Sequence, residues 1–154
     1  MIIEKITAHR DSFHDFRNYE MDEVFLEWYE LNKKVMRKTT RKGFEIGFRL
    51  FHGSEPLQDG DIIAANDNHI ISICVSPCKC IEIHYYGVQE LARLCYEIGN
   101  RHAPLFFSES DENSLLIPFD VPTLDLLEKM RFQTVVREGL LIKPVISNIS
   151  AHSH

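Results

Sequence analysis

The feature that most constrains the fold is the stretch Gly87 to Pro104, the most regular segment of the chain. Apolar residues recur in it at spacings of three and four, which predicts one face of an α-helix: Val88, Leu91, Cys95 and Ile98. Charged residues fall on the other side, so the helix is amphipathic and has one face to bury. The next step of four reaches His102, just before Pro104 stops the helix. We therefore expect a helix from Val88 to His102, about 22 Å long.

The segments around this helix predict an α+β domain. The expected elements are a strand at 80–85, the helix, strands at 104–107 and 114–118, a second helix that opens at 120–123, and a strand at 132–136. The start of the second helix carries Asp120 and Pro122, the residue types that helix N-termini prefer. The resulting order, β-α-β-β-α-β, is that of the ferredoxin-like fold.

The first half of the chain predicts an all-β domain. Beyond Gly43, apolar residues alternate strictly with other residues, at Phe44, Ile46, Phe48 and Leu50. A period of two on either side of a glycine turn indicates a hairpin with one buried face. The pattern changes at residues 76–79, so we expect three parts: an all-β domain at 1–75, a ferredoxin-like domain at 76–140, and a flexible, histidine-containing C-terminal tail at 141–154.

Composition narrows the class of protein. The 154 residues are 44% hydrophobic and carry a formal charge of −6, which is ordinary for a globular domain and argues against a nucleic-acid binder. No apolar run approaches the ~20 residues that a membrane helix needs, and the N-terminus lacks the features of a signal peptide. We therefore expect a cytoplasmic protein. Nucleophile elbows, phosphate loops and paired catalytic acids are also missing, so an enzyme is not expected.

Histidines are the first candidate metal ligands. His102 at a helix end can be an ordinary polar residue that interacts favourably with the helix dipole. It can also be a ligand, but one imidazole cannot hold a metal ion usefully, and a two-fold symmetric dimer would supply the second. His152 and His154 are two imidazoles at the end of the tail, where an ordinary polar terminus is the alternative. The remaining histidines lack a partner at ligand spacing: His9, His14, His52, His69 and His84.

The cysteines are the rival metal ligands. Cys74, Cys78 and Cys80 could form a zinc or copper storage site, although the spacing is irregular and small buried thiols are common in strands. Cys95 lies on the apolar face of the helix and is expected in the core. A protein-interaction module that uses no metal is a further alternative.

Several motifs together resemble one known family. Gly99-Asn100-Arg101-His102 is similar to the signature of the UreE family, the nickel metallochaperones of urease maturation. The other markers follow in the same order with similar gaps, and the set covers nearly the whole chain: Leu26-Glu27-Trp28, Gly60-Asp61-Ile62, Pro122-Thr123-Leu124 and Leu127-Glu128.

This resemblance implies a carrier rather than an enzyme, one that delivers Ni(II) to the urease maturation complex for active-site assembly. It implies a homodimer in which one metal ion bridges the two copies of His102, with His152 and His154 as auxiliary donors. Imidazoles also bind Zn(II), which is an alternative occupant of the same site. The N-terminal domain would contact partners: the other urease accessory proteins, including the accessory GTPase, and the urease apoprotein complex.

Overall fold

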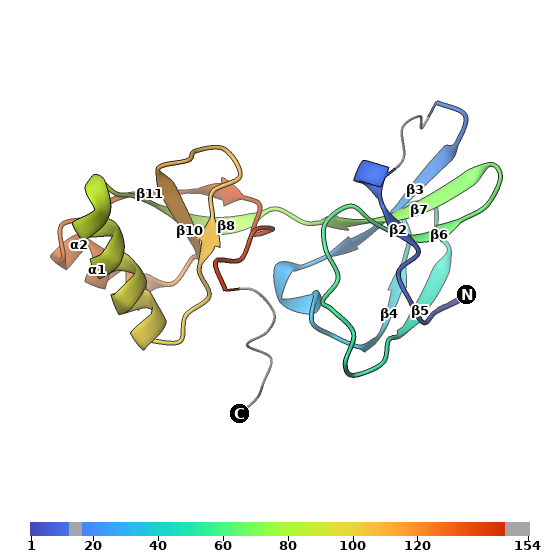
Figure 1. The fold of residues 1–154 in the computed structure, drawn as a ribbon, viewed down its shortest axis with the longest axis horizontal. Helices are drawn as coiled ribbons and strands as arrows, with labels where there is room; N and C mark the ends of the chain where they lie inside the picture. The colour runs from blue at the N-terminus through green and yellow to red at the C-terminus, as the bar shows by residue number, and fades with distance from the viewer. Residues whose placement is uncertain (13–16, 147–154) are drawn as a thin grey trace. The chain divides into compact units, whose positions relative to one another are not determined.

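The computed structural model describes residues 1–12 and 17–146, and the chain divides into two compact units between Ser76 and Pro77. Each unit has its own cluster of buried apolar side chains, as an independent domain requires. The first unit is built from strands and the second from strands and two helices, so the predicted α+β class is confirmed (Figure 1). In the described part of the chain, no helix has both the length and the apolar character to cross a membrane.

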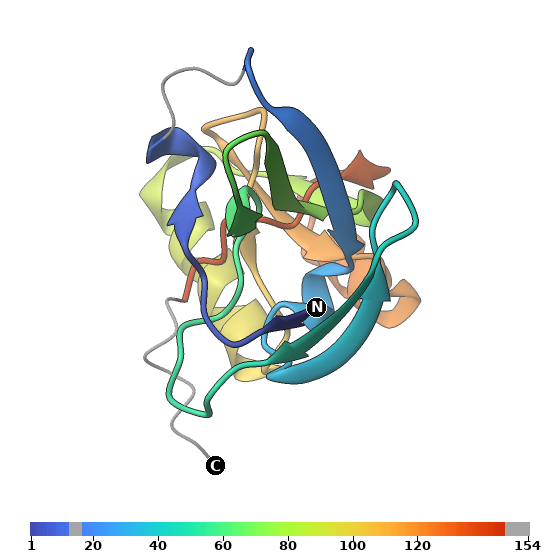
Figure 2. The same ribbon diagram turned by 90° about the vertical axis from the view of Figure 1, so that its right-hand side faces the viewer.

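The N-terminal unit contains two sheets, with strand orders β1-β5-β4 and β2-β6-β7-β3. Its strands are β1 (Ile2–Ile3), β2 (Ala8–His9), β3 (Glu20–Leu26), β4 (Val35–Thr39), β5 (Glu45–Arg49), β6 (Asp61–Ala65) and β7 (His69–Val75). Two short 3-10 turns are η1 (Arg10–Ser12) and η2 (Trp28–Glu30). The predicted hairpin is formed by β4 and β5 (Figure 2). Ile46 and Phe48 of β5 are buried in the core. The period of two therefore identified the buried face correctly.

The C-terminal unit is a four-stranded antiparallel sheet in the order β11-β8-β10-β9. Its elements are β8 (Cys78–His84), α1 (Gly87–Asn100), β9 (Phe106–Phe107), β10 (Ser114–Pro118), α2 (Val121–Lys129) and β11 (Gln133–Gly139). This strand order and the sequence of elements are those of the ferredoxin-like fold. Both helices lie on the same side of the sheet, and their apolar side chains join its core (Figure 1).

Strand β8 divides the chemistry of this sheet between two faces. Ile81 and Ile83 are fully buried against the helices, because alternate side chains of a strand point to the same face. The alternate residues Cys80, Glu82 and His84 therefore lie on the opposite face. That second face, which we call the outer face, carries polar and titratable groups.

The buried face of α1 differs from the predicted one. Leu94 and Ile98 are fully buried, and Leu91 and Cys95 pack beside them, but Val88 is 77% exposed. The three apolar residues Leu91, Leu94 and Ile98 define the line that meets the sheet, and Val88 lies to one side of that line in the first turn. The predicted stripe is therefore divided, with Leu91, Cys95 and Ile98 at the core and Val88 outside it.

The C-terminal end of α1 also differs, because the helix ends at Asn100 rather than His102. His102 has a left-handed backbone, with φ of 54°, and its N–H donates to the Gly99 carbonyl (3.0 Å). The Ala103 N–H donates to the Ile98 carbonyl (3.2 Å), and Ala103 packs against the core. These contacts form a Schellman motif, in which the left-handed position usually holds glycine. His102 is thus turned out of the helix and exposed instead of extending the buried stripe.

Replacing His102 with glycine should stabilise the protein, since glycine adopts the left-handed conformation without a Cβ clash. We expect the free energy of unfolding to rise by up to about 1 kcal/mol in chelator-containing buffer, measured by urea denaturation. His102→Ala is the matched control, because alanine removes the imidazole but keeps the Cβ. Equal stabilities for the glycine and alanine variants would contradict this account of the helix end.

Candidate metal centre

His102 is presented to solvent at the end of α1, and Asn100 and Arg101 before it are exposed as well. In residues 1–12 and 17–146, His102 belongs to no group of three potential ligands with donor atoms within 4.8 Å of one another. A metal ion at His102 therefore needs donors from elsewhere. The predicted auxiliary ligands, His152 and His154, lie outside the described residues.

Beside the buried face of α1 runs a second apolar row that the sheet does not cover. Val88 and Tyr96 are 77% and 72% exposed, and Ala92 between them is exposed too. Their spacing of four places them along one side of the helix. The row leads towards Gly99, where an added Cβ would meet nothing within 4 Å. A helix side that is apolar, open and adjacent to a candidate ligand has the properties of a contact surface.

Three of the four cysteines lie in environments that disfavour the thiolate. Cys78 and Cys80 lie on the outer face with their Sγ atoms 3.8 Å apart, and none of the four cysteines, all described, forms a disulfide. Burial, reinforced by the neighbouring Cys78, raises the pKa of Cys80 to about 12. Burial also raises the pKa of the Cys74 and Cys95 thiols. Since the thiolate is the form that binds metal, these environments favour structural thiols.

The outer face holds a group of potential ligands that the sequence patterns did not identify. One donor atom from each of Glu82, His84 and Asp111 lies within 4.8 Å of the others. Glu82 and His84 come from β8, and Asp111 comes from the loop between β9 and β10. The spacing of two between Glu82 and His84 is the only signal that the sequence gives for this group. Asp111 is far away in the chain, so no local pattern connects it to them.

An ionic network stands next to this group. The Arg137 side chain on β11 donates through Nε to Glu82 Oε2 (2.8 Å), and its Nη2 lies 2.7 Å from Glu109 Oε1. Burial disfavours the Glu109 carboxylate, but hydrogen bonds from Arg137 and from backbone groups outweigh it, so the pKa of Glu109 is lowered. Glu109 is therefore ionised at neutral pH and pairs with the guanidinium of Arg137.

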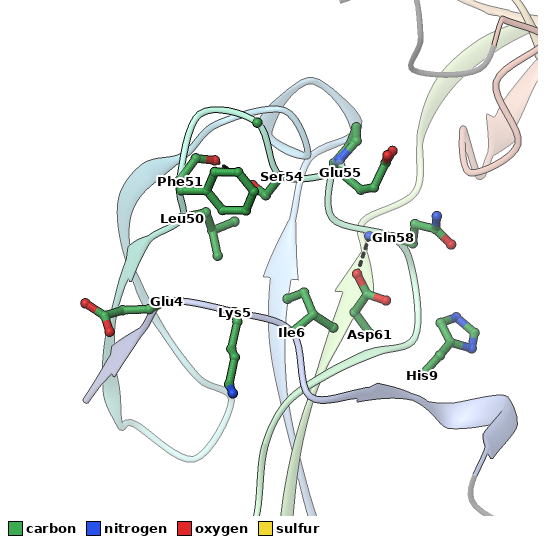
Figure 3. A pocket seen from close by; sticks show the side chains of 12 residues that line it. Glu4, Lys5, Ile6, His9, Leu50, Phe51, Ser54, Glu55, Gln58 and Asp61 are labelled. Atoms are coloured by element: carbon green, nitrogen blue, oxygen red, sulfur yellow. Dashed lines mark hydrogen bonds between the residues drawn. The ribbon is translucent and has the colours of Figure 1, made fainter.

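The N-terminal unit contains a pocket of about 520 Å³ between its first residues and the segment that follows β5 (Figure 3). Ile6, Leu50 and Phe51 give it an apolar lining, and Asp61 accepts a hydrogen bond from the Gln58 N–H (2.7 Å). Burial raises the pKa of Asp61. Among the described residues its side chains form no group of three potential ligands, so the pocket is not a candidate metal centre.

Comparison with known proteins agrees with this architecture. The family model described as UreE urease accessory protein, N-terminal domain, matches residues 2–76, and that of the C-terminal domain matches residues 78–144. A urease accessory protein UreE of Acetivibrio thermocellus is 34% identical over 154 residues, which cover 100% of this chain and 97% of the relative. Relatives of the same name from Helicobacter acinonychis and Helicobacter pylori are 40% and 39% identical over 142 residues, covering 92% of this chain and 82% of each relative. The chain therefore belongs to the UreE family of urease accessory proteins.

Proposed function

We propose that this protein is a nickel-binding metallochaperone that delivers Ni(II) to the urease maturation complex for active-site assembly. The observation that carries the proposal is His102, an exposed imidazole held in a left-handed position where glycine is usual. A residue that opposes the local backbone preference at an exposed site indicates selection for its side chain. Membership of the urease accessory family supplies the process in which that side chain would act.

The proposal includes a homodimer in which α1 packs near a two-fold axis. The exposed row of Val88, Ala92 and Tyr96 would be covered by its own copy, since an isologous contact pairs one surface patch with itself. The same symmetry would bring together the two copies of His102 and turn one imidazole into a pair of nitrogen donors for Ni(II).

His152 and His154 would complete the coordination from the tail, and Zn(II) is the alternative occupant of the same imidazoles. Exchangeable imidazoles and water on an open surface can pass an ion on, whereas a closed cage of four thiolates would retain it. The protein would act in the cytoplasm as a carrier and not as an enzyme. Its N-terminal domain would bind the partners, which are the other urease accessory proteins, including the accessory GTPase, and the urease apoprotein complex.

Replacing His102 with alanine should abolish the shared site, because each dimer then loses both axial nitrogens. Equilibrium dialysis against Ni(II) should show about one ion fewer per dimer, and urease activation in a reconstituted system should fall at least about tenfold. Partner binding should persist. If activation is unchanged, the protein is an interaction module in which metal is incidental. If Cys78→Ser and Cys80→Ser remove the bound metal instead, the thiols are the site.

Replacing Tyr96 with glutamate should weaken the dimer, because the substitution places a charge within the proposed contact. Buried aromatic anchors contribute about 2 kcal/mol or more, so the dimer dissociation constant should rise at least about 30-fold in sedimentation equilibrium. Val121→Glu on α2 is the matched control, since Val121 is also an exposed apolar residue (56%) but lies on the other helix. A dimer that tolerates Tyr96→Glu as well as the control would rule out this interface.

Replacing His152 and His154 together with alanine should weaken Ni(II) binding without removing it. The axial pair of His102 imidazoles remains, so the stoichiometry per dimer should stay the same while the affinity falls about 10- to 100-fold in calorimetric titration. Single substitutions would show which tail histidine is the ligand. Unchanged affinity in the double variant would remove the tail from the proposed site.

A further inference from the structure

Glu82, His84 and Asp111, which we call the outer-face cluster, lie on the side of the C-terminal sheet opposite the two helices. Glu82 and His84 share this face because they are two residues apart on β8. Asp111 reaches the same place from the β9–β10 loop, since Ser114 at the start of β10 pairs with His84 in the antiparallel ladder. Residues from two elements therefore converge on one point, which has no role in the proposed axial site.

The geometry of the outer-face cluster suits a single metal ion. A divalent ion such as Zn²⁺ holds nitrogen and oxygen ligands at about 2.0–2.2 Å in tetrahedral geometry, so neighbouring ligand atoms lie about 3.3–3.6 Å apart. The three donor atoms already lie within 4.8 Å of one another. Closing the site therefore needs the donor atoms to approach one another by about 1 Å.

Charge favours a cation at this place. Glu82, Glu109 and Asp111 bring three carboxylates to the outer face, and the guanidinium of Arg137 pairs with the first two. Two negative charges are left uncompensated there. The buried Glu82 already has its cation in Arg137, so the excess charge belongs to the group as a whole. A divalent ion would neutralise the excess.

The imidazole of His84 is held as metal-ligating histidines are. The Ser114 hydroxyl donates to Asp111 Oδ2 (2.8 Å) and lies 2.7 Å from His84 Nδ1. Because the hydroxyl proton goes to Asp111, Nδ1 of a neutral His84 donates to the hydroxyl, and Nε2 keeps the lone pair that a metal ion would take. Such an outer contact fixes the orientation of the ring and ties the two ligands together.

We propose that the outer-face cluster is a second metal site in each protomer, which takes one divalent first-row transition ion through one imidazole and two carboxylates. The site is independent of His102 and of a dimer, because all its donors come from one chain. Imidazole and carboxylate donors suit Zn(II) and related ions, in contrast to the all-imidazole axial site.

Zinc binding by a full-length chain without the other candidate histidines tests this site. In a variant that combines His102→Ala, His152→Ala and His154→Ala, equilibrium dialysis should still show one Zn²⁺ per protomer. Adding His84→Ala should weaken this binding at least about tenfold, since even the outer partners of ligands contribute about 10- to 100-fold. Since His102 is absent throughout, failure here is separate from failure of the proposed function.

Asp111→Asn provides a second variant that keeps an acceptor for Ser114 and so preserves the fold, checked by near-ultraviolet circular dichroism. It should also weaken zinc binding at least about tenfold. Glu112→Gln is the matched control, because it removes one exposed charge from the same loop and should leave binding unchanged. Either of two dialysis results would overturn the proposal. One is that the triple variant binds no zinc, and the other is that binding survives both His84→Ala and Asp111→Asn. Thiolate charge-transfer absorption from bound Co²⁺ would also overturn it, in favour of Cys78 and Cys80.

Discussion

The packing of α1 on the C-terminal sheet is the contact on which the candidate chemistry depends. Leu94 and Ile98 are fully buried against β8 and β10, which fixes both the rotation of the helix and the position of its last turn. Ile98 also accepts the hydrogen bond that ends the helix, and Ala103 packs back onto the same core. The same residues therefore pack the core and end the helix, and this fixes the position from which His102 projects.

The C-terminal sheet separates apolar and polar functions by the pleat of its strands. On one face Ile81 and Ile83 pack against the helices, and on the other the buried Glu82 pairs with the half-buried Arg137. A buried pair contributes little net stability, but removing one partner is costly because the other charge is left unpaired. The outer face therefore carries the Glu82–Arg137 pair and the His84 imidazole, whereas the helix side presents the exposed His102. One small domain thus carries two kinds of candidate metal ligand without overlap.

Predictions from the sequence were accurate where a periodic pattern extends over many residues and failed where a single residue decides the structure. The hairpin of β4 and β5, the two helices and the β-α-β-β-α-β order were predicted because each rests on a repeated period over many residues. The apolar stripe predicted on α1 included Val88 and left out Leu94, since two lines of spacing three and four can be drawn on the same helix. The left-handed backbone of His102 was missed, because a Schellman motif without glycine lacks its usual signal.

The sequence by itself determined the family, through an ordered set of motifs, and it determined the order of strands and helices, through local periodicity. Only the tertiary structure decided that His102 stands outside the helix, that Val88 and Tyr96 form an exposed row, and that Asp111 meets Glu82 and His84. The physical reason is the range of the interactions. Periodicity reports what a segment buries, whereas convergence of side chains from β8 and a distant loop depends on the register between strands, which no local pattern encodes.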